Sequence, residues 1–195
     1  MTLFLFFFFG SIVGSYFETT NQRIARDDNL ILDSNKRFLR SQCDDCKREL
    51  SWLDLFPIFS FLLLKGKCRY CKKPIKIDHL ISEFLFGMIF CLLILSDNSL
   101  NLILTIPFFS FLFAIALFDY KYFLIPKIYL LFFILISFFS LYFEASLTNI
   151  VFASVMTLTV FIAKQIMDRI MKKETLGNGD LFLIFGLGLF HPPLE

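Results

Sequence analysis

Six apolar runs divide this chain of 195 residues, and several of them approach twenty residues in length. They cover roughly Thr2–Phe17, Leu80–Ser96, Leu100–Phe118, Phe123–Phe143, Asn149–Met167 and Leu181–Phe190. A helix needs about 20 apolar residues to cross the hydrocarbon core of a bilayer. The second to fifth runs meet or approach that length, the first is slightly short and the last is clearly short. Because lipid offers no hydrogen-bond partner to a backbone, the runs predict helices and an all-α polytopic membrane protein.

Charge is concentrated between the first two runs. Of the 19 Lys and Arg residues, 13 fall between Arg23 and Lys76, and Glu18–Asp78 also holds nine acidic residues. Such a stretch cannot lie in lipid, and cytoplasmic loops are the ones enriched in Lys and Arg. We therefore predict a first transmembrane helix over residues 1–17, a cytoplasmic loop over 18–78 and a membrane core over 79–195.

The other basic residues provide a check on this topology. If the loop is cytoplasmic, the gaps Asp97–Leu100 and Glu144–Thr148 fall outside, and both lack Lys and Arg. The gaps Asp119–Tyr122 and Asp168–Asp180 fall inside, and both contain them, as the positive-inside rule expects. In an alternative topology Met1–Ser15 is a cleaved signal peptide, but no basic region precedes its apolar stretch. That alternative would place the cysteines outside, where disulfides can form.

One short apolar stretch lies inside the predicted loop. Leu53–Leu64 is only 12 residues long and is broken by Pro57. It is too short to cross a bilayer, so we predict an interfacial or re-entrant hairpin.

Two aspartates fall on the same predicted membrane face. Asp119 ends the third run, and Asp180 begins the sixth in the sequence GNGD. Two nearby carboxylates cannot both ionise cheaply, so such a pair supplies one acid and one base for peptide hydrolysis. Gly177 and Gly179 permit an irregular backbone beside Asp180. The alternative interpretation is a simple turn in which Asp180 caps the following helix, with DYKYFLIP as an interfacial anchor.

Four of the five cysteines form two CxxC pairs. Cys43 and Cys46 are separated by 21 intervening residues from Cys68 and Cys71. Four thiolates at this spacing predict a structural zinc site with no open coordination position. A dithiol redox pair is the alternative. Cys91 lies within an apolar run and is expected to serve as a small packing residue.

Other chemistries find little support. His79 and His191 are the only histidines, so a Ser-His-Asp or Cys-His site has little material. The chain has no GxGxxG fingerprint and no phosphate-binding glycine loop. Acidic residues interleave with the basic ones around the cysteines, which argues against nucleic acid as a partner. Glu83, in the second run, is predicted to form its bonds within the helix bundle.

Several short segments occur in an order that carries a family resemblance. They are GSIVGSYF, RSQCDDC, LDLFPIFSFLLLKGKC, GKCRYC, HLISEFLFG, DYKYFLIP and GNGD. Together they resemble the prepilin peptidases, or type IV leader peptidases. The matching features are a first-helix motif, paired cysteine knuckles joined by a D-x-x-P linker, a helix with an embedded glutamate, an Asp seven residues before Pro, and G-x-G-D.

The resemblance implies an aspartic endopeptidase of the bacterial inner membrane, multi-pass, with its active site facing the cytoplasm. Asp119 and Asp180 would be the catalytic pair. The implied substrates are type IV prepilins or pseudopilins, whose basic leaders are cut after glycine. Many members also methylate the new N-terminus with S-adenosylmethionine, for which the sequence shows no binding motif. The short form after the second aspartate is similar to competence-type enzymes.

Two departures accompany the resemblance. Phe182 stands where relatives commonly carry Lys, and the chain stops at FHPPLE, so we expect a C-terminus truncated relative to the family. Two other classes stay open: a zinc-knuckle membrane scaffold for pilus or secretion assembly without catalysis, and a membrane thiol-oxidoreductase using the cysteine pairs. Membrane lipid and prepilins are the expected partners, and the sequence does not predict an oligomeric state.

Overall fold

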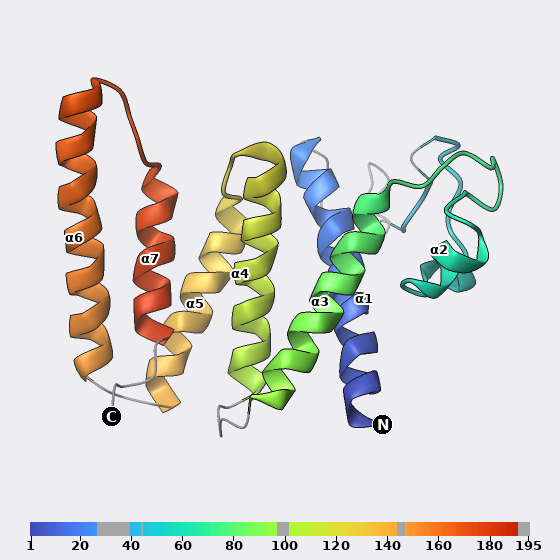
Figure 1. Cartoon of the computed structure of the whole chain (residues 1–195), viewed down its shortest axis with the longest axis horizontal. Coiled ribbons are helices and arrows are strands. Elements are labelled where there is room, and N and C mark those ends of the chain that lie inside the picture. Colours follow the sequence, from blue (N-terminus) through green and yellow to red (C-terminus); the bar gives the residue numbers. More distant parts are fainter. Residues whose placement is uncertain (27–39, 44, 97–101, 144–146, 191–195) are drawn as a thin grey trace. The chain divides into compact units, whose positions relative to one another are not determined.

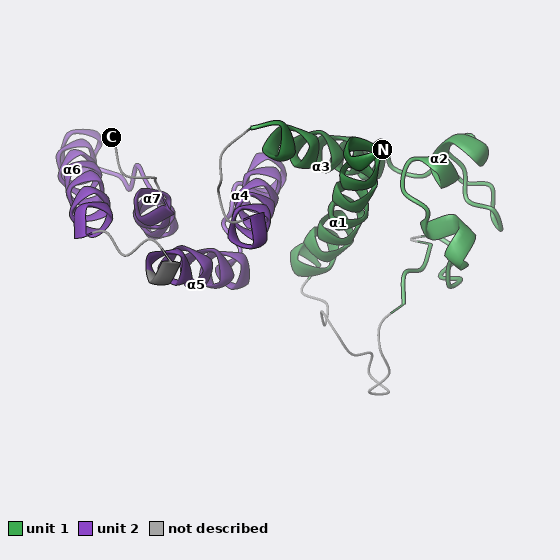
Figure 2. Ribbon diagram, turned by 90° about the horizontal axis from the view of Figure 1, so that it is seen from below, with its two compact units in different colours: residues 1–99 green, residues 100–195 purple. Residues whose placement is uncertain are grey.

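The structure, a computed structural model, describes residues 1–26, 40–43, 45–96, 102–143 and 147–190. The regular structure of these residues is helical apart from two isolated antiparallel bridges, Gln42–Glu49 and Lys67–Pro74 (Figure 1). The predicted all-α class is therefore confirmed. The chain divides into two compact units, Met1–Ser99 and Leu100–Glu195 (Figure 2).

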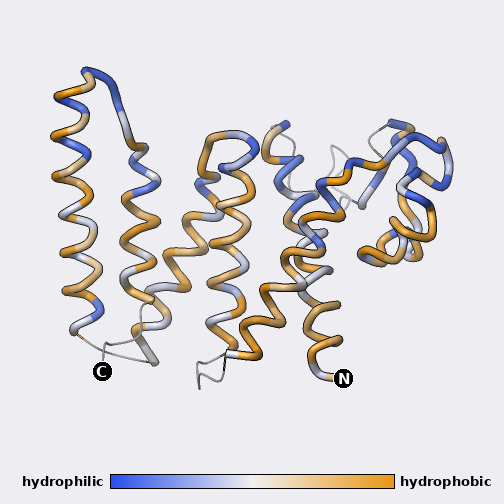
Figure 3. The backbone as a smooth tube through the Cα atoms, in the orientation of Figure 1, coloured by the Kyte–Doolittle hydropathy of each residue, from blue (hydrophilic) through white to orange (hydrophobic). Residues whose placement is uncertain are grey.

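Each predicted apolar run is helical. The helices are α1 Thr2–Ala25, α3 Ile77–Leu95, α4 Leu102–Tyr122, α5 Lys127–Phe143, α6 Leu147–Met171 and α7 Asn178–Phe190. Among the described residues, α1, α3, α4 and α6 are long and apolar enough to cross a membrane, whereas α5 and α7 are shorter apolar helices. Figure 3 shows hydrophobic residues along these helices and hydrophilic ones at several of their ends. Residues 97–101 and 144–146, in the predicted external gaps, lie outside the described residues.

Unit 1 is built on a close pair of antiparallel helices, α1 and α3. Gly10 and Gly14 of α1 form a G-x-x-x-G pattern, which lets helix backbones approach closely in lipid. A Cβ atom at Gly14 would lie 2.7 Å from the carbonyl oxygen of Ser82, and one at Gly10 would lie 2.6 Å from that of Phe86. The ring of Phe86 is completely buried and stacks on Phe17 at 5.5 Å between centroids. The first-helix motif is therefore a packing motif in this structure.

The helix α1 continues to Ala25, through residues that the sequence analysis placed in the loop. The C-terminal end of α1 is polar and yet buried against α3. Glu18 and Asn21 are almost completely buried. The Gln22 amide donates to Glu18 Oε1 at 3.1 Å and lies 3.1 Å from His79 Nε2 of α3. These contacts give the polar turns of α1 a protein surface to pack on, which explains why the helix outlasts its apolar run.

Unit 2 is held together by α7, which contacts the other three helices. Gly186 faces α5, where a Cβ atom would lie 2.6 Å from the Phe133 ring. Gly188 faces α6, where a Cβ atom would lie 2.6 Å from Ala153 Cα. At the far end of α7, Phe190 stacks on Phe108 of α4 with 3.7 Å between ring centroids. Two glycines and one aromatic stack therefore fix α7 among α4, α5 and α6.

Adding a methyl group to the α1–α3 contact should destabilise unit 1. We expect Gly14→Ala to lower stability by about 1–3 kcal/mol, the usual range for overpacking, because its Cβ would collide with backbone. Thermal unfolding in detergent, followed by circular dichroism, measures the effect. Ile12→Leu on the exposed face of α1 is the control. Equal melting temperatures for the two variants would show that the close contact carries no stability.

Candidate active site and metal centre

The four predicted zinc ligands come together. Their sulfur atoms all lie within 4.8 Å of one another, with 3.8 Å between Cys43 Sγ and Cys71 Sγ. Tetrahedral zinc, with Zn–S bonds of about 2.3 Å, places its sulfurs about 3.8 Å apart. The set of Cys43, Cys46, Cys68 and Cys71 therefore fits a closed structural zinc site. No disulfide joins these described cysteines.

Both cysteine pairs lie in the same kind of backbone turn. The N–H of Lys47 donates to the Cys43 carbonyl at 3.0 Å, and the N–H of Lys72 donates to the Cys68 carbonyl at 3.0 Å. The N–H of each first cysteine is bonded to the carbonyl five residues ahead. Lys47 and Lys72 both have positive φ angles, 56° and 61°. The two knuckles therefore repeat one geometry, and together they present four thiols to one point.

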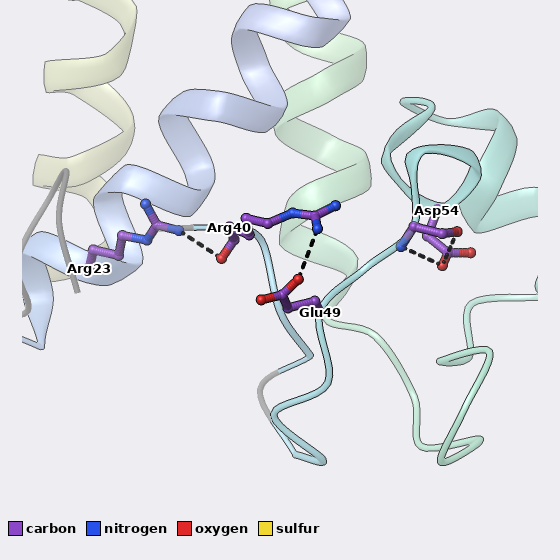
Figure 4. Close-up of polar contacts among 5 residues, drawn as sticks. Arg23, Arg40, Glu49 and Asp54 are labelled. Carbon is purple, nitrogen blue, oxygen red and sulfur yellow. Dashed lines mark hydrogen bonds and ion pairs between the residues drawn. The ribbon is translucent and has the colours of Figure 1, made fainter. Parts of the chain in front are cut away.

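An ion pair joins the two knuckles, and a hydrogen bond joins the segment before the first knuckle to α1. Lys73 of the second knuckle pairs with Asp45 of the first at 2.8 Å. Arg40 pairs with Glu49 at 2.9 Å, and its carbonyl accepts a hydrogen bond from Arg23 of α1 at 3.4 Å (Figure 4). All of these pairs are substantially exposed, so each adds little stability. These pairs orient the knuckles, but they add too little stability to hold the four cysteines together without a metal.

The thiols of the cluster differ in acidity. Burial raises the pKa of Cys43 to about 11. Burial also acts on Cys68, but hydrogen bonds with the backbone N–H groups of Cys71 and Tyr70 and with the Cys43 and Cys71 thiols together lower its pKa to about 7. Because metal binding requires thiolates, loading the site near neutral pH must release protons, at least from Cys43.

The two predicted catalytic aspartates lie at the same end of unit 2. Asp119 is exposed in the last turn of α4, and Asp180 is half-buried in the first turn of α7 (Figure 1). Ile125, in the turn that follows α4, packs on Gly179. A Cβ atom at Gly179 would lie 3.5 Å from Ile125 Cβ. The fold therefore brings together two segments that are far apart in the sequence.

Both aspartates are described, and no hydrogen bond joins their side chains. Asp180 Oδ2 accepts a hydrogen bond from the Gly177 N–H at 3.0 Å, which caps the start of α7. The capping interpretation of GNGD is thus correct as local geometry. It leaves the second carboxylate oxygen of Asp180 for other interactions.

Sequence reasoning missed a polar cavity in unit 1. It has a volume of about 580 Å³ and lies between the α1–α3 pair and the knuckles. Its walls include Ser15, Thr19 and Gln22 of α1, with His79 and Glu83 of α3. The spacing of the three α1 residues, four and then three apart, is that of one helix face. This polar stripe was the available signal, and it lies at the boundary between the first apolar run and the loop.

Two family models match the chain, one on each half. The model described as the bacterial peptidase A24 N-terminal domain matches residues 8–97, and the model described as the type IV leader peptidase family matches residues 106–195. The chain belongs to the type IV leader peptidase family. The family predicted from the sequence is therefore confirmed.

Curated relatives agree with this assignment. The prepilin leader peptidase/N-methyltransferase of Vibrio cholerae is 27% identical over 196 residues, covering 95% of this chain and 76% of that protein. The Bacillus subtilis protein of the same name is 35% identical over 131 residues, covering 67% and 50%. That of Myxococcus xanthus is 26% identical over 188 residues, covering 94% and 54%, so the chain spans about half of the last two. No solved structure matches the chain.

Metal analysis should find one zinc per chain. We expect Cys43→Ser and Cys68→Ser to lose it, because three thiolates hold zinc more weakly than four. Inductively coupled plasma mass spectrometry of the purified protein measures the content. Cys91→Ser is the matched control, since Cys91 lies apart on α3 and donates to the Leu3 carbonyl. Full zinc content in the first two variants would contradict the four-cysteine site.

Proposed function

We propose that this chain is a membrane aspartic endopeptidase that removes the basic leader of type IV prepilins or pseudopilins. Membership of the leader peptidase family supports the substrate class. The observation that carries the proposal is the contact of Ile125 with Gly179, because it places the segments bearing Asp119 and Asp180 side by side. Two carboxylates at one end of a helical unit can supply the acid and the base that peptide hydrolysis requires.

The chemistry needs the two aspartates to act on one water and one peptide. One carboxylate takes a proton from the water as it attacks the scissile carbonyl, and the other donates a proton to the departing amine. Catalytic contacts are often loose without substrate and tighten when it binds. Asp119 is exposed and ends a helix, so its side chain has room to move toward Asp180.

The charges around this end of unit 2 favour the cytoplasmic face of the bacterial inner membrane. Lys121 and Lys127 follow Asp119, while Arg169, Lys172 and Lys173 precede Asp180. Basic residues near the ends of membrane helices mark the cytoplasmic side. Prepilin leaders would meet the enzyme at that face.

In this proposal the zinc is structural. A closed four-cysteine site has no position for water, so it would fold the loop between α1 and α3 and take no part in hydrolysis. The runner-up is a zinc-knuckle scaffold that binds prepilins without cleaving them. The contact between the two aspartate segments favours the peptidase, because a scaffold has no need for it.

N-methylation is a second candidate activity. The curated relatives named above are also called N-methyltransferases, and unit 1 holds a polar cavity large enough for a small ligand such as S-adenosylmethionine. Methyl transfer from labelled S-adenosylmethionine to a processed pilin would test it. Transfer that persists when the peptidase is inactivated would place the two activities at separate sites.

Replacing either aspartate with asparagine should abolish leader cleavage. We expect Asp119→Asn and Asp180→Asn each to reduce it by at least about 10³-fold, because neither amide can transfer the proton. Co-expression with a prepilin, followed by the gel shift that accompanies leader loss, measures the effect. Zinc content and melting temperature confirm that the variants are folded.

Glu174→Gln is the matched control for this experiment. It removes an exposed carboxylate from the connection that precedes α7, and we expect normal cleavage. Substantial cleavage by either aspartate variant would exclude a shared acid–base pair. Prepilin binding without cleavage by the unmodified protein would favour the scaffold.

A further inference from the structure

The stretch Trp52–Leu64, here called the linker segment, presents an unusual apolar surface. It consists of the 3-10 helix η1 Trp52–Leu55, a turn at Pro57 and the short helix α2 Phe59–Leu63. Trp52 is 79% exposed and Leu63 is 82% exposed. Its other strongly exposed apolar residues are Leu53, Phe56, Phe59 and Leu62. So much exposed apolar surface on so short a segment needs a covering partner.

We propose that the linker segment inserts into the cytoplasmic leaflet of the bilayer, where lipid acyl chains cover it. Its contacts with α1 fix its depth. The Phe56 ring lies 5.9 Å from that of Phe8. Phe8 lies near the middle of Thr2–Phe17, the apolar run of α1, and so near the middle of the apolar layer that this helix defines.

The helix α3 gives the same depth independently. The residues on either side of Phe8 pack on α3: Phe7 on Phe84 at 5.9 Å and Phe9 on Phe90 at 5.8 Å. Residues 84 and 90 lie on either side of the middle of the apolar run Leu80–Ser96. Both helices therefore place the Phe56 ring near the centre of the apolar layer that they define.

The backbone of the linker segment is adapted to an environment without water. Pro57 has no N–H group, and Ile58 has a φ of 60°, so no regular helix continues through this turn. The Ile58 N–H donates to Glu83 Oε2 of α3 at 2.7 Å. An irregular backbone is tolerated at membrane depth only where protein satisfies its polar groups. Glu83, itself 8% exposed, supplies that partner from within α3.

The one charged side chain of the linker segment is also fully partnered. Asp54 Oδ1 accepts from Arg69 at 2.7 Å, and Oδ2 accepts from the Ser51 hydroxyl at 2.7 Å. Its side chain is only 3% exposed. Beyond the segment, Lys65 and Lys67 bring the chain back to a polar environment suited to phosphate headgroups. The linker segment meets α1 at the contact between the Phe56 and Phe8 rings.

The single tryptophan of the chain makes the proposal directly measurable. Trp52 lies in the linker segment, and no other Trp contributes emission. The full-length protein, reconstituted in phosphatidylcholine–phosphatidylglycerol vesicles with dibrominated acyl chains, should show strong quenching by the bromines. Water-soluble acrylamide should quench it only weakly. The reverse pattern would place Trp52 in water and overturn the proposal.

Two matched variants give the depth profile. In a Trp52→Phe background, Leu63→Trp places the probe on α2, and Tyr70→Trp places it in the second knuckle. We expect bromolipid quenching of the Leu63→Trp protein to exceed that of the Tyr70→Trp protein several-fold. Equal quenching at the two positions would contradict insertion. Protection of the Leu63→Trp probe from both quenchers would mean that protein covers the surface, which would also overturn the proposal.

The role of Glu83 has its own comparison. In the Leu63→Trp protein, Glu83→Gln keeps an oxygen acceptor for the Ile58 N–H, whereas Glu83→Leu removes it. We expect the glutamine variant to retain bromolipid quenching and the leucine variant to lose most of it. Unchanged quenching in the leucine variant, with zinc content intact, would show that the segment is held at depth by other contacts.

Discussion

A hydrocarbon solvent offers no hydrogen-bond partner, and this single constraint orders the whole structure. The apolar helices satisfy most of their backbone hydrogen bonds internally, four of those described are long enough to cross a bilayer, and many Phe and Leu side chains remain exposed along them. Polar groups lie inside the apolar layer where another group of the protein forms a hydrogen bond with them. Glu83 on the Ile58 N–H and Gln22 beside His79 are examples. The same constraint drives charged residues to the helix ends, where both aspartates and the zinc knuckles lie.

In this chain, close packing holds the helices together, a role that the hydrophobic effect has for proteins in water. Gly10 and Gly14 bring α1 against α3, while Gly186 and Gly188 bring α7 against α5 and α6. Lipid does not push helices together, so close backbone contact and aromatic stacking must hold each unit. The proposed function depends on this packing, because the position of α7 determines the position of Asp180. A zinc site on the loop between α1 and α3 would add a cross-link to a segment that has little regular secondary structure.

Sequence reasoning predicted the parts whose signal is local. The six apolar runs became helices, and the spacing of two CxxC pairs predicted four sulfurs around one point. It missed the features that depend on contacts between segments far apart in the sequence. The helix α1 extends to Ala25 because its polar C-terminal turns pack against α3, and hydropathy does not predict that contact. Sequence reasoning predicted that Leu53–Leu64 lies at or in the membrane. It did not predict that Glu83 accepts a hydrogen bond from the Ile58 N–H, because the two residues are 25 positions apart. The order of motifs indicated Asp119 and Asp180, yet no spacing in the sequence gives their separation.

The account depends most on the meeting of the two aspartate-bearing segments, and a disulfide measures it directly. In a Cys91→Ala background, Ile125→Cys with Gly179→Cys places two β-carbons about 3.5 Å apart, within the range of a disulfide. A protease site inserted at residues 144–146 lets a gel report the bond, because only cross-linked halves stay together after cleavage. We predict rapid and nearly complete cross-linking on mild oxidation in membranes. Halves that separate fully under the same conditions would show that the segments do not meet and would contradict the proposed active site.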